Sequence, residues 1–380
     1  MTKPEAADHH GSHRELLWAP EDPSLPRADI DAIIVPTARH PANLKDAVNL
    51  AASLKCALVT LHSGKWTSAR ETARRFRGKA DLHLHAIDVP DTANLGLPDL
   101  LTSQLLAGTR FARPADTGAK RNLGLLLSHL VGWKRVVFLD DDIEIHDPEY
   151  LRQASALLNI YNVVGLSIGG FPDNSVVCHA YRSVGGDQQS FIGSGALVVQ
   201  VPRSPSFFPD IYNDDWFYML DAKKGLQPAA TIGEVIQQPY DPFRTPDRAR
   251  AEEFGDVLAE GIFWLLDQGR SIAEADLGHW RDFLPRRKMF IERVLGMVSQ
   301  AGHVEPGDKA RMEAALKAAR GRLALVTPEL CQTYLQAWTA DRERWRYHIT
   351  GLKAQPSLES ALEALARPGS APMICHHALR

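Results

Sequence analysis

The fold of this chain is decided by the segment RVVFLDDD, residues 135–142. A continuous apolar run is typical of a strand buried on both faces of a parallel sheet. Three carboxylates follow it, and side chains alternate along a strand, so we expect Asp140 and Asp142 on one face and Asp141 on the other. In open α/β sheets, ligands bind beyond the carboxyl ends of the strands, which places these aspartates at the candidate site.

Two carboxylates on one face repel each other unless one is protonated or a cation lies between them. Oxygen ligands suit Mg²⁺ or Mn²⁺, and Mg²⁺ typically takes one or two carboxylates together with substrate phosphates. The segment therefore predicts that Asp140 and Asp142 bind a divalent metal. The alternative is that the three aspartates only cap the following turn.

Outward from this segment, apolar runs alternate with amphipathic stretches, which predicts a mainly parallel sheet with helices on both faces. Helices are expected at 41–55, 119–131 and 147–159. The expected strands are 31–39, 57–64, 81–89, 135–143, 163–171, 190–201 and 230–240.

After about residue 270 the sequence no longer alternates between strand and helix patterns. Helical periodicity continues there without a convincing strand. We therefore divide the chain into a flexible leader (1–28), an α/β domain (29–270) and a helical C-terminal region (271–380). The leader carries His9, His10 and His13, and histidines scattered near a terminus are usually solvated.

The 380 residues include 43 basic and 46 acidic side chains, for a net charge of −3. This balance argues against a protein that coats nucleic acid, which would carry a basic excess. No run approaches the roughly 20 apolar residues of a membrane span. The four cysteines lie far apart without a CxxC pair, which favours reduced thiols in a cytoplasmic protein over disulfides or a zinc knuckle.

A second candidate element is the helix start at residues 116–124, DTGAKRNLG. Lys120 and Arg121 lie near the helix N-terminus, where a cation is unfavourable by up to about 1 kcal/mol. A bound anion would reverse that sign, so both are candidates for phosphate contacts. The alternative is that both side chains extend into solvent.

Three weaker elements follow along the chain. Gly193-Ser194-Gly195 allows close approach of the backbone to a ligand or only a tight turn; it is not part of a GxGxxG motif, and the chain has no P-loop. Asp214 and Asp215 precede a helical run, as a general base or as an N-cap. Trp216 fits a sugar-stacking wall or core packing, and Asp241 a metal ligand or a structural turn.

Over about residues 29–245 the order of these elements resembles that of nucleotide-sugar glycosyltransferases of the GT-A fold, most like the broad family 2. A strand ends in VPTAR (35–39), a KRNLG helix start (120–124) follows, a DxD stands at a strand end, a glycine-containing strand comes next, and an acidic pair precedes a helix. The resemblance implies a GT-A sandwich with a mainly parallel sheet. It also implies an enzyme, a hexosyltransferase that uses Mn²⁺ or Mg²⁺.

The resemblance further implies a role for each matching residue. Asp142 would bind the metal with Asp140, which would also contact the ribose or sugar; Asp241 is the candidate third metal ligand only from its position after the last expected strand. Asp215 or Asp214 would be the base of an inverting enzyme, and Trp216 would contact the acceptor. The remaining positions would bind the donor: Pro36, Thr37, Arg39, Lys120, Arg121, Asn122, Asp140, Asp141, Gly193, Ser194 and Gly195.

The implied donor is a UDP-, GDP- or dTDP-linked sugar, and the acceptor a soluble small molecule or peptide. Retaining relatives use a His as metal ligand, and the nearest histidine after the last strand is His279, which favours the inverting reading. A nucleotidyltransferase is the rival enzyme, although PTARH (36–40) lacks the glycines of its usual loop. A non-catalytic nucleotide-sugar-binding protein is the third possibility. The helical region would serve dimerisation or cover the acceptor site.

Overall fold

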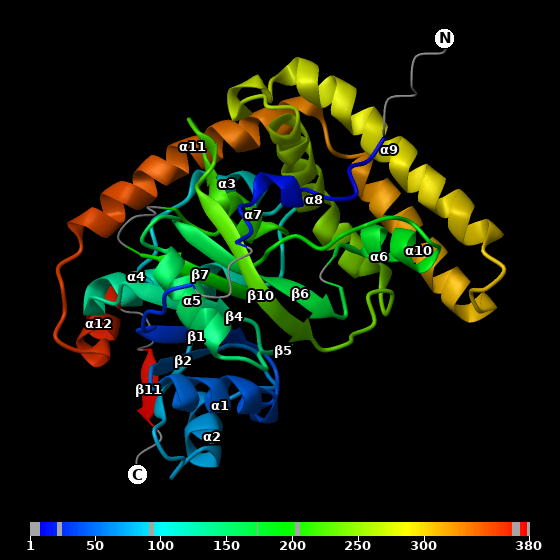
Figure 1. Cartoon of the computed structure of the whole chain (residues 1–380). Helices are drawn as coiled ribbons and strands as arrows, with labels where there is room; N and C mark the ends of the chain where they lie inside the picture. Colours follow the sequence, from blue (N-terminus) through cyan, green and yellow to red (C-terminus); the bar gives the residue numbers. More distant parts are fainter. Residues whose placement is uncertain are drawn as a thin grey trace.

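A computed structural model describes residues 8–20, 25–90, 95–172, 174–201, 206–366 and 373–377. Within these residues the centre is a nine-stranded sheet in the order β11-β3-β2-β1-β4-β7-β6-β10-β5 (Figure 1). The strands are β1 (Ala32–Thr37), β2 (Ala57–His62), β3 (His83–Asp88), β4 (Arg135–Leu139), β5 (Ile143–Glu144), β6 (Val163–Gly170), β7 (Ala196–Gln200), β10 (Ala229–Gln237) and β11 (Ile374–His377). A separate ribbon pairs β8 (Leu220–Asp221) with β9 (Gly225–Leu226).

The sheet is mainly parallel, as predicted. Strands β1, β2, β3, β4, β6 and β10 run in one direction. Strand β7 runs against both of its neighbours, and β5 and β11 run against theirs at the two edges. The chain leaves β1 toward β2 and β3 on one side and returns to β4 on the other, so the strand order switches between β1 and β4.

Helices cover both faces of the sheet, because alternate residues of the central strands bury apolar side chains on opposite sides. Helices α1 (Lys45–Leu54), α2 (Ala69–Arg75) and α5 (Glu149–Leu157) pack on one face. Helices α4 (Thr117–Val131), α6 (Val176–Ser183), α7 (Asp214–Met219) and α8 (Pro246–Asp267) pack on the other. Shorter pieces are α3 (Leu101–Leu106) and the 3₁₀ turns η1 (Arg14–Leu16), η2 (Pro41–Leu44) and η4 (Ile272–Glu274).

The C-terminal region is helical, as expected, in α9 (Leu277–Gln300), α10 (Pro306–Leu323), α11 (Pro328–Gly351) and α12 (Leu358–Leu365). It is not strand-free, because β11 returns to pair with β3 at the sheet edge (Figure 1). Trp280, Trp338 and Trp345 are fully buried in the same apolar cluster as the sheet face under α4. The region therefore shares a core with the α/β part. Among the helices that the structure describes, none combines the length and apolar character needed to cross a membrane.

The expectation that the leader histidines are solvated is wrong for His13, which is 4% exposed. Its Nδ1 lies 2.5 Å from Asp267 Oδ2 and its Nε2 lies 3.2 Å from Glu260 Oε2. Burial alone lowers the pKa of an imidazole, but the hydrogen bonds to Asp267 and Glu260 outweigh it and raise the pKa of His13 to about 9. The described part of the leader is thus docked on α8, while residues 1–7 and 21–24 lie outside the described residues.

Candidate functional site

A cleft of about 720 Å³ opens at the carboxyl ends of four neighbouring parallel strands, β1, β2, β3 and β4. This edge contains the switch in strand order, where open α/β sheets form their ligand sites. The lining residues come from the loops after these strands and from the start of α4: Pro36, Thr37, Ala38, Arg39, Ser63, Gly64, Val89, Pro90, Pro114, Ala115, Asp116, Thr117, Lys120, Asp140, Asp141 and Asp142.

Near the cleft, the pairing of β1 with β4 ends earlier than its pairing with β2. Pairing between them stops at Ile34 and Phe138, whereas β1 stays paired with β2 as far as Thr37. Pro36, which has no N–H to donate, falls in the stretch beyond the β4 pairing. Thr37 then donates from Oγ1 to Asp141 Oδ2 at 2.5 Å, which joins the ends of the two strands.

The three aspartates follow β4 in a turn, closed by a hydrogen bond from the Ile143 N–H to the Asp140 carbonyl. The prediction that Asp141 faces away from its neighbours is wrong, because the strand ends at Leu139 and its alternation does not continue into the turn. All three line the cleft. Arg39 Nη2 donates to Asp142 Oδ2 at 2.9 Å, and Arg39 Nε lies 3.4 Å from Asp141 Oδ1.

Burial is the main reason that the pKa values of Asp141 and Asp142 are raised. The neighbouring charge of Asp140 acts in the same direction on both groups, and Arg39 opposes it. A cation at this turn would relieve the repulsion between these carboxylates.

The alternative that Lys120 and Arg121 extend into solvent is wrong, since both are buried, at 2% and 5% exposed. Lys120 lines the cleft, and its Nζ donates to the Thr37 carbonyl at 3.0 Å and pairs with Asp116 at 3.0 Å. Burial lowers the pKa of Lys120, which Asp116 partly offsets. Lys120 therefore contributes a buried cation to the cleft lining, paired with Asp116.

Arg121 lies behind the cleft and joins two of the predicted acidic elements. Its Nη2 donates to Asp140 Oδ1 at 2.8 Å, and its Nη1 donates to both carboxylate oxygens of Asp214 at 3.0 Å. Burial raises the pKa of Asp214 to about 6, although Arg121 acts to lower it. Arg121 thus pairs with two aspartates and is not among the residues that line the cleft.

The Gly193-Ser194-Gly195 turn connects the aspartate turn (140–142) to Asp215. The Asp140 N–H donates to the Gly195 carbonyl at 3.1 Å. Ser194 donates to Asp215 Oδ2 from its N–H at 2.8 Å and from its hydroxyl at 3.1 Å. A Cβ at Gly195 would meet Ile143 and Ile168 at 3.4–3.6 Å, an ordinary contact, so packing alone does not require glycine there.

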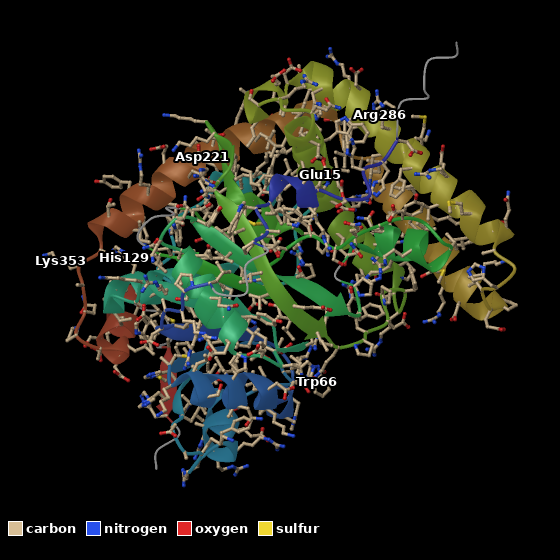
Figure 2. The ribbon with its side chains drawn as sticks, viewed as in Figure 1. Glu15, Trp66, His129, Asp221, Arg286 and Lys353 are labelled. Carbon is tan, nitrogen blue, oxygen red and sulfur yellow. The ribbon has the colours of Figure 1, made fainter. Side chains whose placement is uncertain are left out.

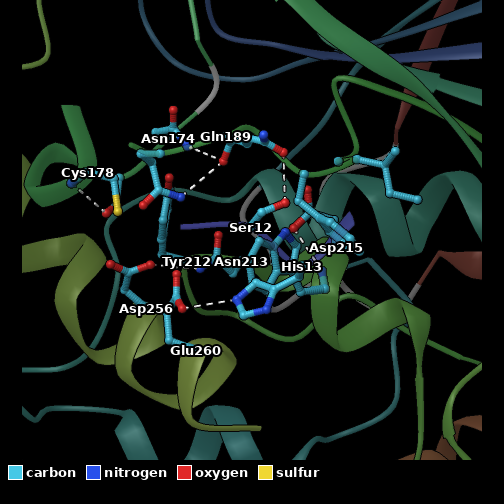
Figure 3. Close-up of a pocket in the computed structure, with 16 residues that line it drawn as sticks. Ser12, His13, Asn174, Cys178, Gln189, Tyr212, Asn213, Asp215, Asp256 and Glu260 are labelled. Carbon is cyan, nitrogen blue, oxygen red and sulfur yellow. Dashed lines mark hydrogen bonds and ion pairs between the residues drawn. The ribbon is translucent and has the colours of Figure 1, made fainter. Parts of the chain in front are cut away.

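Asp215 and Trp216 line a different, smaller cavity of about 40 Å³, which Ser12 and His13 of the leader help to enclose (Figure 3). Such a volume holds a few water molecules and no sugar. Trp216 packs against Phe263 at 4.5 Å and Phe191 at 5.1 Å between ring centroids. Core packing, the alternative for Trp216, is therefore what this conformation shows.

The cleft lining also excludes Gly193, Ser194 and Gly195, and two further predicted site residues, Asn122 and Asp241, lie outside it. Asn122 is buried away from the cleft lining, where its amide exchanges two hydrogen bonds of 2.8 Å with the Phe208 backbone. Asp241 is not among the residues that line the cleft; one of its carboxylate oxygens accepts from the Phe243 N–H and the other pairs with Arg311 of α10. Asn122 thus holds a neighbouring segment, and Asp241 has the structural turn role.

Sequence reasoning missed the cleft residues Ser63, Gly64, Pro90 and Asp116. The first three come directly after β2 and β3, so their position after a predicted strand was the available signal. Trp66 follows Gly64 by two residues and is 79% exposed on the surface (Figure 2). Trp66 is not among the lining residues, and its exposed indole, two positions from Gly64, is a candidate apolar contact for a ligand.

The charges of the lining fit a divalent cation. Four carboxylates, those of Asp116, Asp140, Asp141 and Asp142, stand against the two cations Arg39 and Lys120. An anionic diphosphate alone would be repelled by this excess of negative charge. Carboxylate oxygens are also the donors that Mg²⁺ and Mn²⁺ prefer, so the donor set agrees with the predicted metal.

No protein-family model matches the chain, and no curated protein matches it. Solved structures do match it. The mannosyltransferase PcManGT from Pyrobaculum calidifontis, in complex with GDP-Man and Mn²⁺, is 14% identical, with 87% of this chain and 88% of that chain covered and a TM-score of 0.40. A protein from Desulfovibrio desulfuricans G20, assigned as a nucleotide-diphospho-sugar transferase, is 10% identical, with 56% and 83% covered and a TM-score of 0.31. The chain is thus similar, at low identity and partial overlap, to two proteins described as nucleotide-sugar transferases.

Proposed function

We propose that this protein is a metal-dependent glycosyltransferase with a GT-A catalytic unit, which moves a hexose from a nucleoside-diphosphate sugar to an acceptor hydroxyl. One observation carries the proposal. A 720 Å³ cleft at the switch in strand order brings together Arg39, Lys120 and the aspartate turn 140–142. The cleft is large enough for a nucleotide-sized ligand, and its lining supplies both phosphate-binding cations and metal-binding carboxylates.

Each part of the donor has a place in the proposed complex. The nucleoside lies against the ends of β1 to β3, near Thr37, Ser63 and Pro90, and the diphosphate lies between Lys120 and the aspartate turn. When bound by Asp142 and Asp140, Mn²⁺ or Mg²⁺ supplies positive charge against the charge that develops on the leaving diphosphate. Arg39, which already pairs with Asp141 and Asp142, orients these carboxylates.

Asp215 is the better of the two candidate bases for an inverting reaction, although it lines the separate 40 Å³ cavity and not the donor cleft, so this role requires that cavity to open toward the cleft. Asp214 is buried in an ion pair with Arg121, which leaves it no access to an acceptor. Asp215 receives its hydrogen bonds from Ser194, next to Gly195, whose carbonyl contacts Asp140. A base at this position takes the proton of the attacking hydroxyl while the sheet holds the donor. The acceptor is a soluble small molecule or peptide in this proposal.

The proposal is tested by a thermal-shift screen of UDP-, GDP- and dTDP-sugars with and without Mn²⁺. A ligand that binds the native state raises the melting temperature by mass action. We expect a shift from one nucleotide class that is larger with Mn²⁺ than without it. Donor hydrolysis should release a nucleoside diphosphate; release of pyrophosphate would favour a nucleotidyltransferase, and binding without any turnover would favour a binding protein.

Asp142→Asn is the most direct test of the metal assignment. We expect donor hydrolysis with Mn²⁺ to fall by about 10²–10³-fold, the usual cost of losing one electrostatic contact to the transition state. The matched control is Glu144→Gln, two residues along the chain, where the carboxylate lies outside the cleft lining. Equal activity in Asp142→Asn and the control would reject the role of Asp142.

A further inference from the structure

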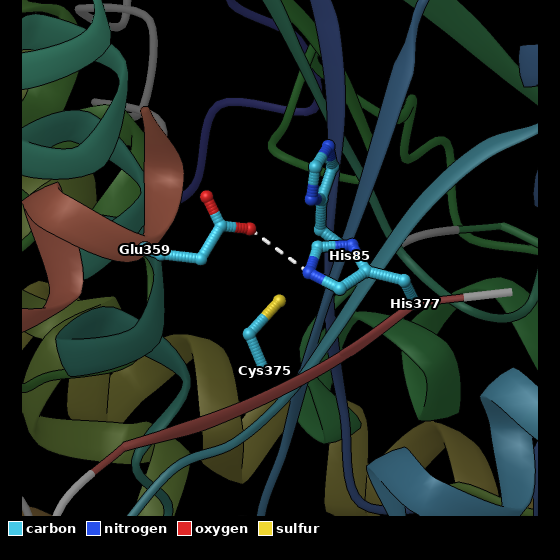
Figure 4. A group of neighbouring side chains, drawn as sticks. All are labelled: His85, Glu359, Cys375 and His377. Atoms are coloured by element: carbon cyan, nitrogen blue, oxygen red, sulfur yellow. Dashed lines mark ion pairs between the residues drawn. The ribbon is translucent and has the colours of Figure 1, made fainter. Parts of the chain in front are cut away.

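A second cluster of potential metal ligands lies at the edge of the central sheet that β11 and β3 form. It contains His85 of β3, Cys375 and His377 of β11, and Glu359 of α12 (Figure 4). One ligand atom from each lies within 4.8 Å of all the others, and no second group of this kind occurs in the described part of the chain. None of the four lines the candidate donor cleft.

Strand register explains why these side chains meet. In the antiparallel β3–β11 pair, His377 stands opposite His85 and Cys375 stands opposite Ile87. Residues two apart on a strand share a face, so Cys375 and His377 project on the side where His85 lies. The imidazole centroids of His85 and His377 are 5.0 Å apart. Glu359 comes from the first turn of α12, and its Oε1 lies 2.9 Å from His377 Nε2.

One ring nitrogen in the cluster has no hydrogen-bond partner. His85 Nδ1 is buried and has no hydrogen-bond partner. An unpaired buried ring nitrogen costs free energy unless something binds it. The Cys375 thiol is free and partly buried beside it, while the side chains of Glu359 and His377 are 50% and 35% exposed and leave a path from solvent.

We propose that His85, Glu359, Cys375 and His377 form a structural Zn²⁺ site that fastens the C-terminal strand to the sheet. One thiolate, two imidazoles and one carboxylate make the mixed sulfur, nitrogen and oxygen set that Zn²⁺ takes in tetrahedral sites, whereas Mg²⁺ prefers oxygen alone. The thiolate and the carboxylate together balance the charge of the ion. Tetrahedral zinc holds its ligand atoms roughly 3.5 Å apart, so a small contraction of the cluster suffices.

The site also has a structural use. Strand β3 would be an exposed edge without β11, and an uncovered edge invites pairing with other chains. Binding requires the Cys375 thiol to lose its proton, which passes to solvent as the sulfur–metal bond forms. The metal then ties a segment next to the C-terminus to a strand about 290 positions earlier in the chain, and so reinforces the backbone pairing of β11 with β3.

The test uses the full chain, treated with a chelator and titrated with Co²⁺ as a spectroscopic substitute for Zn²⁺. We expect a thiolate-to-metal charge-transfer band and visible d–d bands of tetrahedral intensity that saturate at one equivalent of cobalt, whereas cobalt bound at the aspartate turn adds no thiolate band. Zn²⁺ should displace the cobalt and raise the melting temperature. Cys375→Ser should remove the charge-transfer band and weaken binding by at least the roughly 10–100-fold that loss of even a supporting contact costs.

His376→Gln is the matched control, because this imidazole lies between the two ligands on the same strand and faces the other way. It should keep the band and the affinity. Glu359→Gln, at a half-exposed helix position, provides a second ligand variant if Cys375→Ser does not fold, and should weaken Zn²⁺ binding. No thiolate band in the unmodified chain, or a band that survives Cys375→Ser, would overturn the proposal.

Discussion

At the residue scale, the acidic pair divides into one structural and one chemical candidate. Asp214 and Asp215 are neighbours in sequence, yet Asp214 pairs with buried Arg121 and Asp215 accepts from Ser194. Adjacent residues at a helix start point in different directions, so the two carboxylates have different environments. Replacing Asp215 should therefore affect sugar transfer, whereas replacing Asp214 should affect stability.

Asp215→Asn should lower sugar transfer by about 10²–10⁴-fold, the usual contribution of a general base, with donor binding retained. Asp214→Asn should instead lower the free energy of unfolding by about 3–5 kcal/mol, because it leaves Arg121 buried with one partner fewer. Transfer kinetics and urea titrations of both variants check this. If Asp214→Asn loses transfer at unchanged stability while Asp215→Asn stays active, the assignments are reversed.

At the scale of elements, the leader segment is held to α8 by a titratable contact. His13 has its pKa raised to about 9, and burial would raise the pKa of Glu260, but the hydrogen bond from His13 lowers it to about 2. A raised His pKa stabilises docking below about 6.5, and this stabilisation is lost as the pH rises through 9. A lowered Glu pKa stabilises docking above about 4.5, and this stabilisation is lost as the pH falls toward 2. Docking of the leader should therefore be strongest between about pH 4.5 and pH 6.5.

We expect amide protection in the leader to fall as the pH rises from 6.5 to 9, with a loss of up to about 3 kcal/mol for a shift of this size. Hydrogen exchange of the Trp18 and Gln189 amides, which bond to Ala229 and Gly11, reports this opening after correction for intrinsic rates. His13→Gln is the control and should remove the pH dependence. Protection that is equally pH-dependent in this variant would place the titrating group elsewhere.

Helices α8 and α9 are joined by a buried charge network. Arg287 of α9 donates to both carboxylate oxygens of Glu253 at 3.0 Å and also pairs with Asp256 at 2.5 Å. All three side chains are almost fully buried. Removing the cation leaves two unpaired carboxylates in the core, which costs far more than losing an exposed pair.

Arg287→Ala should lower the free energy of unfolding by about 3–5 kcal/mol. Arg281→Ala, on the same helix, is the matched control, because Arg281 is 65% exposed and lies 3.9 Å from Glu329. Its effect should stay below about 1 kcal/mol. Denaturant midpoints of the two variants give the comparison; similar values would mean that the buried network adds little.

At the scale of the whole molecule, the expected boundary at residue 270 is not a boundary in the core. One apolar cluster runs from Leu126 under the sheet through Phe263 to Trp338 of α11. Two regions that share a core should unfold together. Calorimetry of the full chain should therefore show one transition with equal van't Hoff and calorimetric enthalpies. Two separated transitions would show that residues 271–380 unfold as a unit of their own.

The sequence by itself determined the alternation of strands and helices, the carboxyl-end position of residues 140–142 and the helical C-terminal region. These features depend on local periodicity, which each segment carries in its own residues. The nearness of Pro36, Arg39 and Lys120 to the aspartates could be predicted for the same reason, since these residues stand beside predicted strand ends or helix starts.

Only the tertiary structure decided which side chains meet. The turn after Leu139 brings Asp141 toward Thr37, and Arg121 is neutralised by two aspartates that lie 19 and 93 positions away. His13 is buried by carboxylates about 250 positions later, and His85 meets Cys375 across the sheet edge. Contacts at such separations depend on strand order and on the packing of α8 against the leader. No local pattern encodes them, because they arise only when the whole core has formed.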